Sequence, residues 1–152
     1  MESLQKRYSP NSVCYGCGPK NPHGLHLDST PQGDTLVADW TPQPYHSAFA
    51  DFASGGIVSV LLDCHGNWTA AHTLMKSRNL DAPPGTVTAE LTVKFLRPTP
   101  LVPWHLGAWP TKIDGDKVWV EGSLEANAKQ TATMTGLFVA VKEGHPAFHR
   151  WK

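Results

Sequence analysis

The sequence predicts an α+β domain in which an antiparallel sheet of about five or six strands wraps around one long central helix. Residues 54–68 form the one long stretch without Pro, Lys, Arg or Glu, and their apolar side chains recur at helical spacing. From Thr86 onward the period changes to the strict alternation that is typical of β-strands. The helix and the sheet each have to bury an apolar face, and packing them together buries both.

The first third of the chain is expected to hold loops and two short strands. We expect residues 1–13, which are mostly polar, to be loosely ordered. We assign residues 1–24 to an N-terminal tail and a Cys/Gly/Pro-rich loop, and residues 25–152 to a single domain. Strands are expected at 25–29 and 35–41, followed by an aromatic loop at 42–53.

The chain after the central helix is expected to form a loop and then four long strands. Residues 70–78 are compatible with an extension of the helix, and the Pro-containing segment 79–85 with a loop. Asp114-Gly115 is a favourable two-residue hairpin turn, and residues 127–130 suit another. Strands are expected at 86–97, 104–113, 118–126 and 131–141.

The polar face of the predicted helix is unusual because it consists of small residues around one carboxylate, Asp63. A solvated face would carry Lys, Glu or Gln, so something is expected to approach this face closely. Ser54 can cap the helix, and the glycines after it offer backbone N–H groups at the positive end of the helix dipole. The alternative is a solvated Asp that follows an ordinary tight turn. The other residues on this face are Gly56, Ser59 and Asn67.

Composition argues against several classes of partner. The chain has 152 residues, a formal net charge of zero and a pI near 7.1, with Lys and Arg scattered along it. No basic stripe indicates nucleic acid, no apolar run is long enough to span a membrane, and the start lacks the apolar core of a signal peptide. We expect a soluble, cytoplasmic protein with no nucleic-acid or membrane partner.

The three cysteines do not suggest a disulfide framework, since their number is odd. Cys14, Cys17, His23 and His26 are zinc-competent ligands at short spacing. Their Cys-to-His gap is tighter than in zinc-finger modules, so the favoured interpretation is a turn-rich loop with buried thiols. Neither a metal site nor a cofactor is predicted.

Three segments carry a resemblance to a known family. CYGCGPKNPHGLHL is similar to a CxGCGxxNPxGLxL opening, and SGGIVSVLLD resembles a central-helix motif that usually reads His-Gly-Gly, about seven mostly apolar residues, then Asp or Glu. TAELTVKFLRPTPL resembles the strand after that helix, which ends in Arg-Pro. Together they span most of the chain and resemble the hotdog-fold acyl-CoA thioesterases, in particular the small PaaI-like, phenylacetate-degradation-type enzymes.

The resemblance implies a hotdog fold, hydrolysis of an acyl- or aryl-CoA thioester, and no cofactor apart from the CoA of the substrate. Asp63 falls on the catalytic carboxylate, and Gly55 on the glycine whose backbone N–H polarises the thioester carbonyl. Thr88 falls on a strand residue that helps to position the nucleophile or water. The chain departs from the pattern at Ser54, which stands where the family most often has His. Ser54 is still expected at the catalytic site, because it can hydrogen-bond a substrate, but it cannot act as a base near neutral pH.

Further residues have both a substrate-binding and a structural interpretation. Asn67 could orient Asp63 or a water, or be a plain helix-surface residue. Arg97 could meet a CoA phosphate, or be an exposed strand end. Aromatic residues could line an acyl pocket or pack in the core, and Gly56 could contact substrate. His65 is expected to be packed, and His46 and His72 to be structural or solvated. The aromatic candidates are Phe49, Phe52 and Trp68.

Spacing predicts that one helix cannot complete the site. Gly55 and Asp63 are eight residues apart, about 12 Å along a helix, which is too far for both to touch one carbonyl. Two antiparallel central helices would bring the N-terminus of one to the carboxylate of the other. We therefore expect a homodimer, or a homotetramer built from dimers, with two shared sites per dimer.

Rival functions stay open at this stage. An enoyl-thioester hydratase on the same fold would need an Asp paired with a His at the site, and no His is expected close to Asp63. A non-catalytic acyl-CoA or small-ligand binding protein is compatible with Ser54. A zinc-binding interaction module is the most distant alternative.

Overall fold

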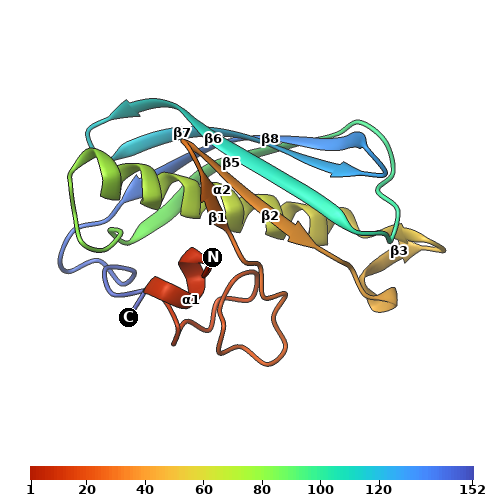
Figure 1. The fold of residues 1–152 in the computed structure, drawn as a ribbon, viewed down its shortest axis with the longest axis horizontal. Coiled ribbons are helices and arrows are strands. Elements are labelled where there is room, and N and C mark those ends of the chain that lie inside the picture. Colours follow the sequence, from red (N-terminus) through yellow and green to blue (C-terminus); the bar gives the residue numbers. More distant parts are fainter.

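The computed structural model describes residues 1–152 and shows one long helix lying along one face of a six-stranded antiparallel sheet (Figure 1). The order of strands is β1-β2-β6-β7-β8-β5, and a separate short ribbon pairs β3 with β4. The predicted α+β architecture is confirmed. The elements of the main layer are α2 (Gly55–Ser77), β1 (Thr30–Gln32), β2 (Thr35–Trp40), β5 (Thr86–Phe95), β6 (Trp104–Asp114), β7 (Lys117–Ala126) and β8 (Lys129–Ala140).

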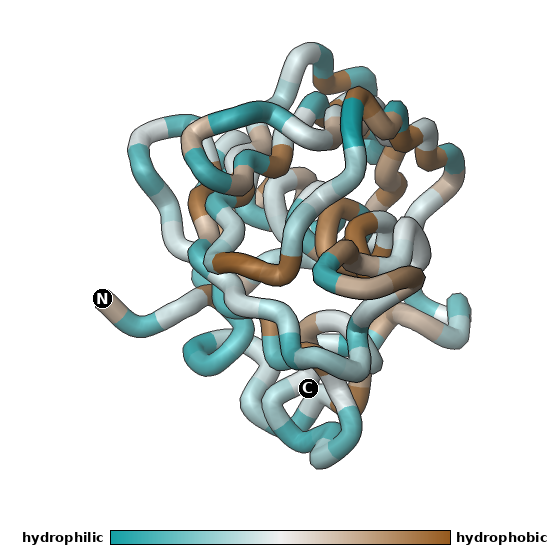
Figure 2. Tube along the Cα trace, turned by 90° about the vertical axis from the view of Figure 1, so that its right-hand side faces the viewer, coloured by the Kyte–Doolittle hydropathy of each residue, from teal (hydrophilic) through white to brown (hydrophobic).

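Helix α2 is unbroken over 23 residues, so the predicted helix and its extension form one element. It begins after Ser54, whose Oγ accepts a hydrogen bond from the Gly56 N–H at 3.2 Å, as expected for an N-cap. Its apolar face packs on the sheet, and Gly66 allows a close approach: a Cβ at this position would lie 2.7 Å from the Phe138 ring. Figure 2 shows hydrophobic stretches in the middle of the molecule and along its upper right edge, and hydrophilic stretches in the outer loops.

The hairpin turns follow from residues that tolerate positive φ. The β6–β7 turn consists of Gly115 and Asp116, one residue later than the Asp114-Gly115 turn predicted from the sequence, and Gly115 has a φ of 61°. In the β7–β8 turn both Asn127 and Ala128 have positive φ, 53° and 61°. This is the backbone that a two-residue turn needs to match the twist of its strands.

Residues 1–13 are not loosely ordered, contrary to the prediction. They include helix α1 (Leu4–Tyr8), and Gln5 is completely buried. Its side chain donates to the Ser29 hydroxyl at 3.0 Å and accepts from the Ser29 N–H at 2.7 Å. Hydropathy could not reveal this, because a buried polar side chain is recognised only by its hydrogen-bond partners.

The predicted strand at 25–29 is also wrong. His26 has a φ of 54°, which interrupts an extended backbone, and the paired strand β1 starts only at Thr30. The aromatic loop at 42–53 contains three short elements. They are a 3-10 helix (Pro44–His46), β3 (Ser47–Phe49) and β4 (Phe52–Ala53).

His65 is packed in the core, as predicted. It has no exposed surface, and its ring bonds both the Ser29 hydroxyl and the Leu36 carbonyl at 2.8 Å. Burial lowers the pKa of His65 to about 4, so the ring is neutral at physiological pH. With Nε2–H donating to Leu36, Nδ1 accepts from Ser29, and both ring nitrogens are satisfied.

The C-terminal segment closes the far side of the core. Trp151 stacks on Trp68 with ring centroids 4.3 Å apart, and Trp68 has no exposed surface. Trp68 is therefore a core residue and does not line an acyl pocket. No helix of the chain combines the length and the apolar character needed to cross a bilayer.

Candidate active site

Asp63 and Thr88 meet between the middle of α2 and the edge strand β5. The Thr88 hydroxyl donates a hydrogen bond of 2.6 Å to Asp63 Oδ1. Asp63 is half-buried and Thr88 is exposed, so the pair can be reached from outside the chain. The sequence resemblance had assigned these two residues to one site, and the fold brings them into contact although they are 25 positions apart.

Burial raises the pKa of Asp63 above its ordinary value, because a carboxylate loses hydration there. The hydrogen bond from Thr88 opposes this and lowers the pKa, the nearby Cys14 raises it, and the Arg150 charge lowers it. The net direction is upward. A carboxyl group whose pKa is moved toward neutrality is a better proton acceptor in catalysis.

The N-terminus of α2 offers one free donor. The Gly56 N–H is engaged by the Ser54 side chain, while no hydrogen bond of the chain uses the N–H of Gly55. This N–H lies at the positive end of the helix dipole, where an oxyanion is stabilised. Asp63 lies eight residues farther along the unbroken helix, about 12 Å away, so one chain does not bring the two groups together.

A cavity of about 400 Å³ lies beside this helix end and contains three of the predicted site residues, Phe49, Gly55 and Arg97. The sequence analysis missed Phe95, whose ring would lie 3.3 Å from a Cβ at Gly55. The signal for it was available, since β5 runs antiparallel to α2 and Thr88 is opposite Asp63, so the end of β5 must lie at the start of the helix. Phe49 packs on Phe52 with centroids 5.2 Å apart.

Asn67 does not reach Asp63. It is buried, and its amide oxygen accepts a hydrogen bond of 2.5 Å from the Thr86 hydroxyl. This contact fixes the start of β5 against α2, two residues before Thr88. Asn67 thus helps to hold strand β5 in position against helix α2.

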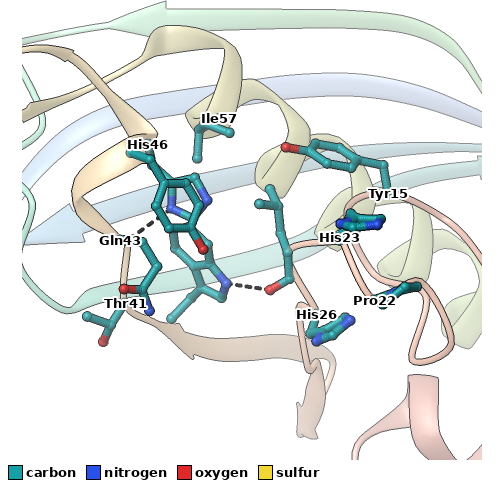
Figure 3. Close-up of a pocket in the computed structure, with 12 residues that line it drawn as sticks. Tyr15, Pro22, His23, His26, Thr41, Gln43, His46 and Ile57 are labelled. Carbon is teal, nitrogen blue, oxygen red and sulfur yellow. Dashed lines mark hydrogen bonds between the residues drawn. The ribbon is translucent and has the colours of Figure 1, made fainter.

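The largest cavity, about 550 Å³, was not anticipated (Figure 3). Tyr15, His23 and His26 from the N-terminal loop form one side, Gln43 and His46 the other, and Ile57 of α2 the top. His46 Nδ1 accepts a hydrogen bond of 2.8 Å from the Gln43 N–H. The two loop histidines thus face this cavity. The alternative zinc set of Cys14, Cys17, His23 and His26 does not form, because the histidines are not part of the thiol cluster that contains both cysteines.

Comparison with solved structures gives close likenesses in fold. A thioesterase superfamily protein from Shewanella loihica is 30% identical, matches 82% of this chain and 98% of its own, and gives a TM-score of 0.67. The PaaI protein of the Escherichia coli phenylacetic acid degradation operon is 15% identical over 78% of this chain and 81% of its own, with a TM-score of 0.65. A phenylacetic acid degradation-related protein from Ralstonia eutropha is 18% identical over 76% and 86%, also with 0.65.

The chain belongs to the thioesterase superfamily and has the hotdog fold that the sequence motifs indicated. The match to the Shewanella protein establishes the membership of this family, because it covers nearly all of that chain. The two phenylacetate-related proteins are less similar in sequence and show only that the fold is shared. No family model and no curated protein matches the sequence.

Proposed function

We propose that this protein hydrolyses an acyl-CoA or aryl-CoA thioester to the free acid and CoA. The observation that carries the proposal is the Asp63–Thr88 contact, a half-buried carboxylate with a raised pKa held in an accessible position within the thioesterase fold. Asp63 delivers water as a general base, or attacks the thioester carbonyl itself. In either case negative charge develops on the carbonyl oxygen and requires a donor.

That donor is the Gly55 N–H of a second chain. The edge strand β5 is ten residues long, pairs only with β8, and exposes the large side chain of Phe95. An open edge of this length favours pairing with another copy. Antiparallel docking along β5 would set the α2 N-terminus of one chain beside Asp63 of the other, which gives two sites per homodimer.

Substrate binding follows from the cavity at the helix start. Phe49 and Phe95 give it apolar walls suited to an acyl or aryl group. Arg97 lies at its edge, is exposed and has no ion-pair partner in the chain. Its guanidinium is suited to a phosphate of CoA.

The test is release of free CoA from short, long and aromatic acyl-CoAs by the unaltered protein and by Asp63→Asn. The Asn side chain can still accept from Thr88, so the fold is expected to persist. We expect a loss of about 10²- to 10⁴-fold in kcat, the range for a general base. Asp81→Asn is the matched control, since Asp81 is exposed and makes no hydrogen bond or ion pair. Equal rates in Asp63→Asn and the unaltered protein would contradict the proposal.

A binding protein without turnover is the second candidate. It is favoured by one observation: Ser54 replaces the usual His, and its Oγ already accepts the Gly56 N–H. Saturable binding of CoA esters with no CoA release by any member of the panel would replace the hydrolase with this function.

A further inference from the structure

The three cysteines of the chain come together although one of them lies 47 or more positions from the others in sequence. The Sγ atoms of Cys14, Cys17 and Cys64 all lie within 4.8 Å of one another, and those of Cys14 and Cys64 are 3.8 Å apart. Cys17 and Cys64 are buried and Cys14 is half-buried. The sequence analysis had considered Cys14 and Cys17 with two histidines, and the structure replaces those histidines with Cys64 of helix α2.

The separation fits a shared metal ion. Zinc–thiolate bonds of about 2.3 Å in tetrahedral geometry place sulfur atoms about 3.8 Å apart. A disulfide would need about 2.05 Å. The Cys14–Cys64 distance of 3.8 Å equals the first value, and the other two pairs need to close by at most about 1 Å to reach it.

The loop that carries Cys14 and Cys17 is built as a tight turn against the helix. The Gly18 N–H donates to the Cys14 carbonyl at 2.8 Å, and a Cβ at Gly18 would lie 2.3 Å from the Cys14 nitrogen. A Cβ at Gly16 would lie 2.3 Å from Cys64 Sγ. The absence of a side chain at Gly18 therefore allows the turn to close, and its absence at Gly16 allows the loop to pack directly against Cys64. This packing holds the three sulfur atoms close together.

A buried donor near the sulfur atoms has no partner. Trp68 Nε1 is fully buried and is the one buried side-chain nitrogen or oxygen without a hydrogen-bond partner in the chain. The indole lies close to the Cys17 thiol. A metal-bound thiolate would offer this N–H an acceptor, and such outer donors orient and stabilise metal-bound thiolates.

We propose that Cys14, Cys17 and Cys64 form a zinc site that ties the N-terminal loop to the middle of helix α2. Zn²⁺ forms three Zn–S bonds, the remaining thiol protons are released to solvent, and no oxidation takes place. No other His, Cys, Asp or Glu atom belongs to the cluster, so water takes the fourth position on the half-buried side at Cys14. The ion ties the loop to the helix, and it lies beside the proposed chemistry, since Cys64 follows Asp63 in sequence and Cys14 influences the pKa of Asp63.

The first test is made on the unaltered chain, purified under reducing conditions with zinc in the growth medium. We expect one zinc per chain by elemental analysis. Replacing it with Co²⁺ should give thiolate-to-cobalt charge-transfer absorption and the visible bands of a tetrahedral site. Free thiols with no bound metal, or a disulfide between any two of the cysteines, would overturn the proposal.

Variants then identify the ligands. Cys14→Ser and Cys17→Ser should each weaken zinc binding by more than about tenfold. The control is the double variant His23→Ala/His26→Ala, which should keep one zinc. Zinc content that follows the histidines, or that no cysteine substitution changes, would overturn the assignment. The cobalt spectrum of the unaltered chain decides the matter if a variant fails to fold.

Discussion

The Thr88 hydroxyl donates a hydrogen bond of 2.6 Å to Asp63 Oδ1, and this contact links the edge strand β5 to the centre of α2. Thr88→Val removes the donor and keeps the shape of the side chain. Hydrogen bonds to charged groups contribute about 1.5–3 kcal/mol, so we expect kcat to fall by about 10- to 100-fold. Thr88→Ser keeps the hydroxyl and should stay close to the unaltered rate. Steady-state CoA release measures both, and equal losses in the two variants would contradict a role for the hydroxyl.

The free N–H of Gly55 can be removed with little change to the helix. Proline is favoured at the first helical position, and the extended backbone of Ser54, with φ −63° and ψ 133°, suits a residue that precedes proline. Gly55→Pro should lower kcat by about 10²- to 10³-fold, as for loss of an oxyanion donor. Gly55→Ala retains the N–H and adds only a methyl group near Phe95, so it serves as the matched control. A similar loss in both variants would point to crowding at Phe95 instead.

Mixed dimers test whether each site uses two chains. We expect chains with Gly55→Pro and chains with Asp63→Asn to be inactive separately. When the two are co-expressed and the mixed dimer is isolated by two tags, one of its sites regains both intact groups. We expect about half the activity of the unaltered dimer. A chain carrying both substitutions, paired with an unaltered chain, leaves each site with one defect and should stay inactive. Retained activity in that pair would exclude a shared site.

Hydrophobic periodicity in the sequence predicts the secondary structure, but it does not predict which polar or thiol groups meet in the core. The period of residues 54–77 and the alternation in 86–95 reflect which faces are buried, so the central helix and the long strands were accessible from sequence. The pairing of Asp63 with Thr88 came from the family resemblance. Gln5 and Ser29 are buried as a hydrogen-bonded pair, which no hydropathy pattern signals. The role of Cys64 was hidden for a similar reason, because it looked like one more apolar residue on the helix face.

The helix–sheet contact at Gly66 gives a stability prediction. A methyl group there would meet the Phe138 ring and the Met134 terminus, both at 2.7 Å. Gly66→Ala gains up to about 1 kcal/mol of helix propensity but forces the packed core apart, which typically costs about 1–3 kcal/mol. We expect net destabilisation, measured as a lower midpoint in urea unfolding. Gly107→Ala, on β6 with nothing within 4 Å of the added methyl, is the control and should not destabilise. A raised midpoint for Gly66→Ala would show that the core relaxes.

We expect His46, which lines the large cavity, to make the stability of the fold depend on pH. Burial lowers the pKa of His46, and its Nδ1 accepts the Gln43 N–H, so the folded state holds the ring neutral. Because the pKa of His46 is lower in the folded than in the unfolded state, His46 contributes to the free energy of unfolding. This contribution is complete above the unfolded pKa of about 6.5 and is lost as the pH falls below it. His46→Asn keeps an acceptor for Gln43 but cannot titrate. We expect the free energy of unfolding to change less between about pH 7.5 and about pH 5.5 in this variant than in the unaltered protein. Equal slopes in His46→Asn and the unaltered protein would contradict this role of His46.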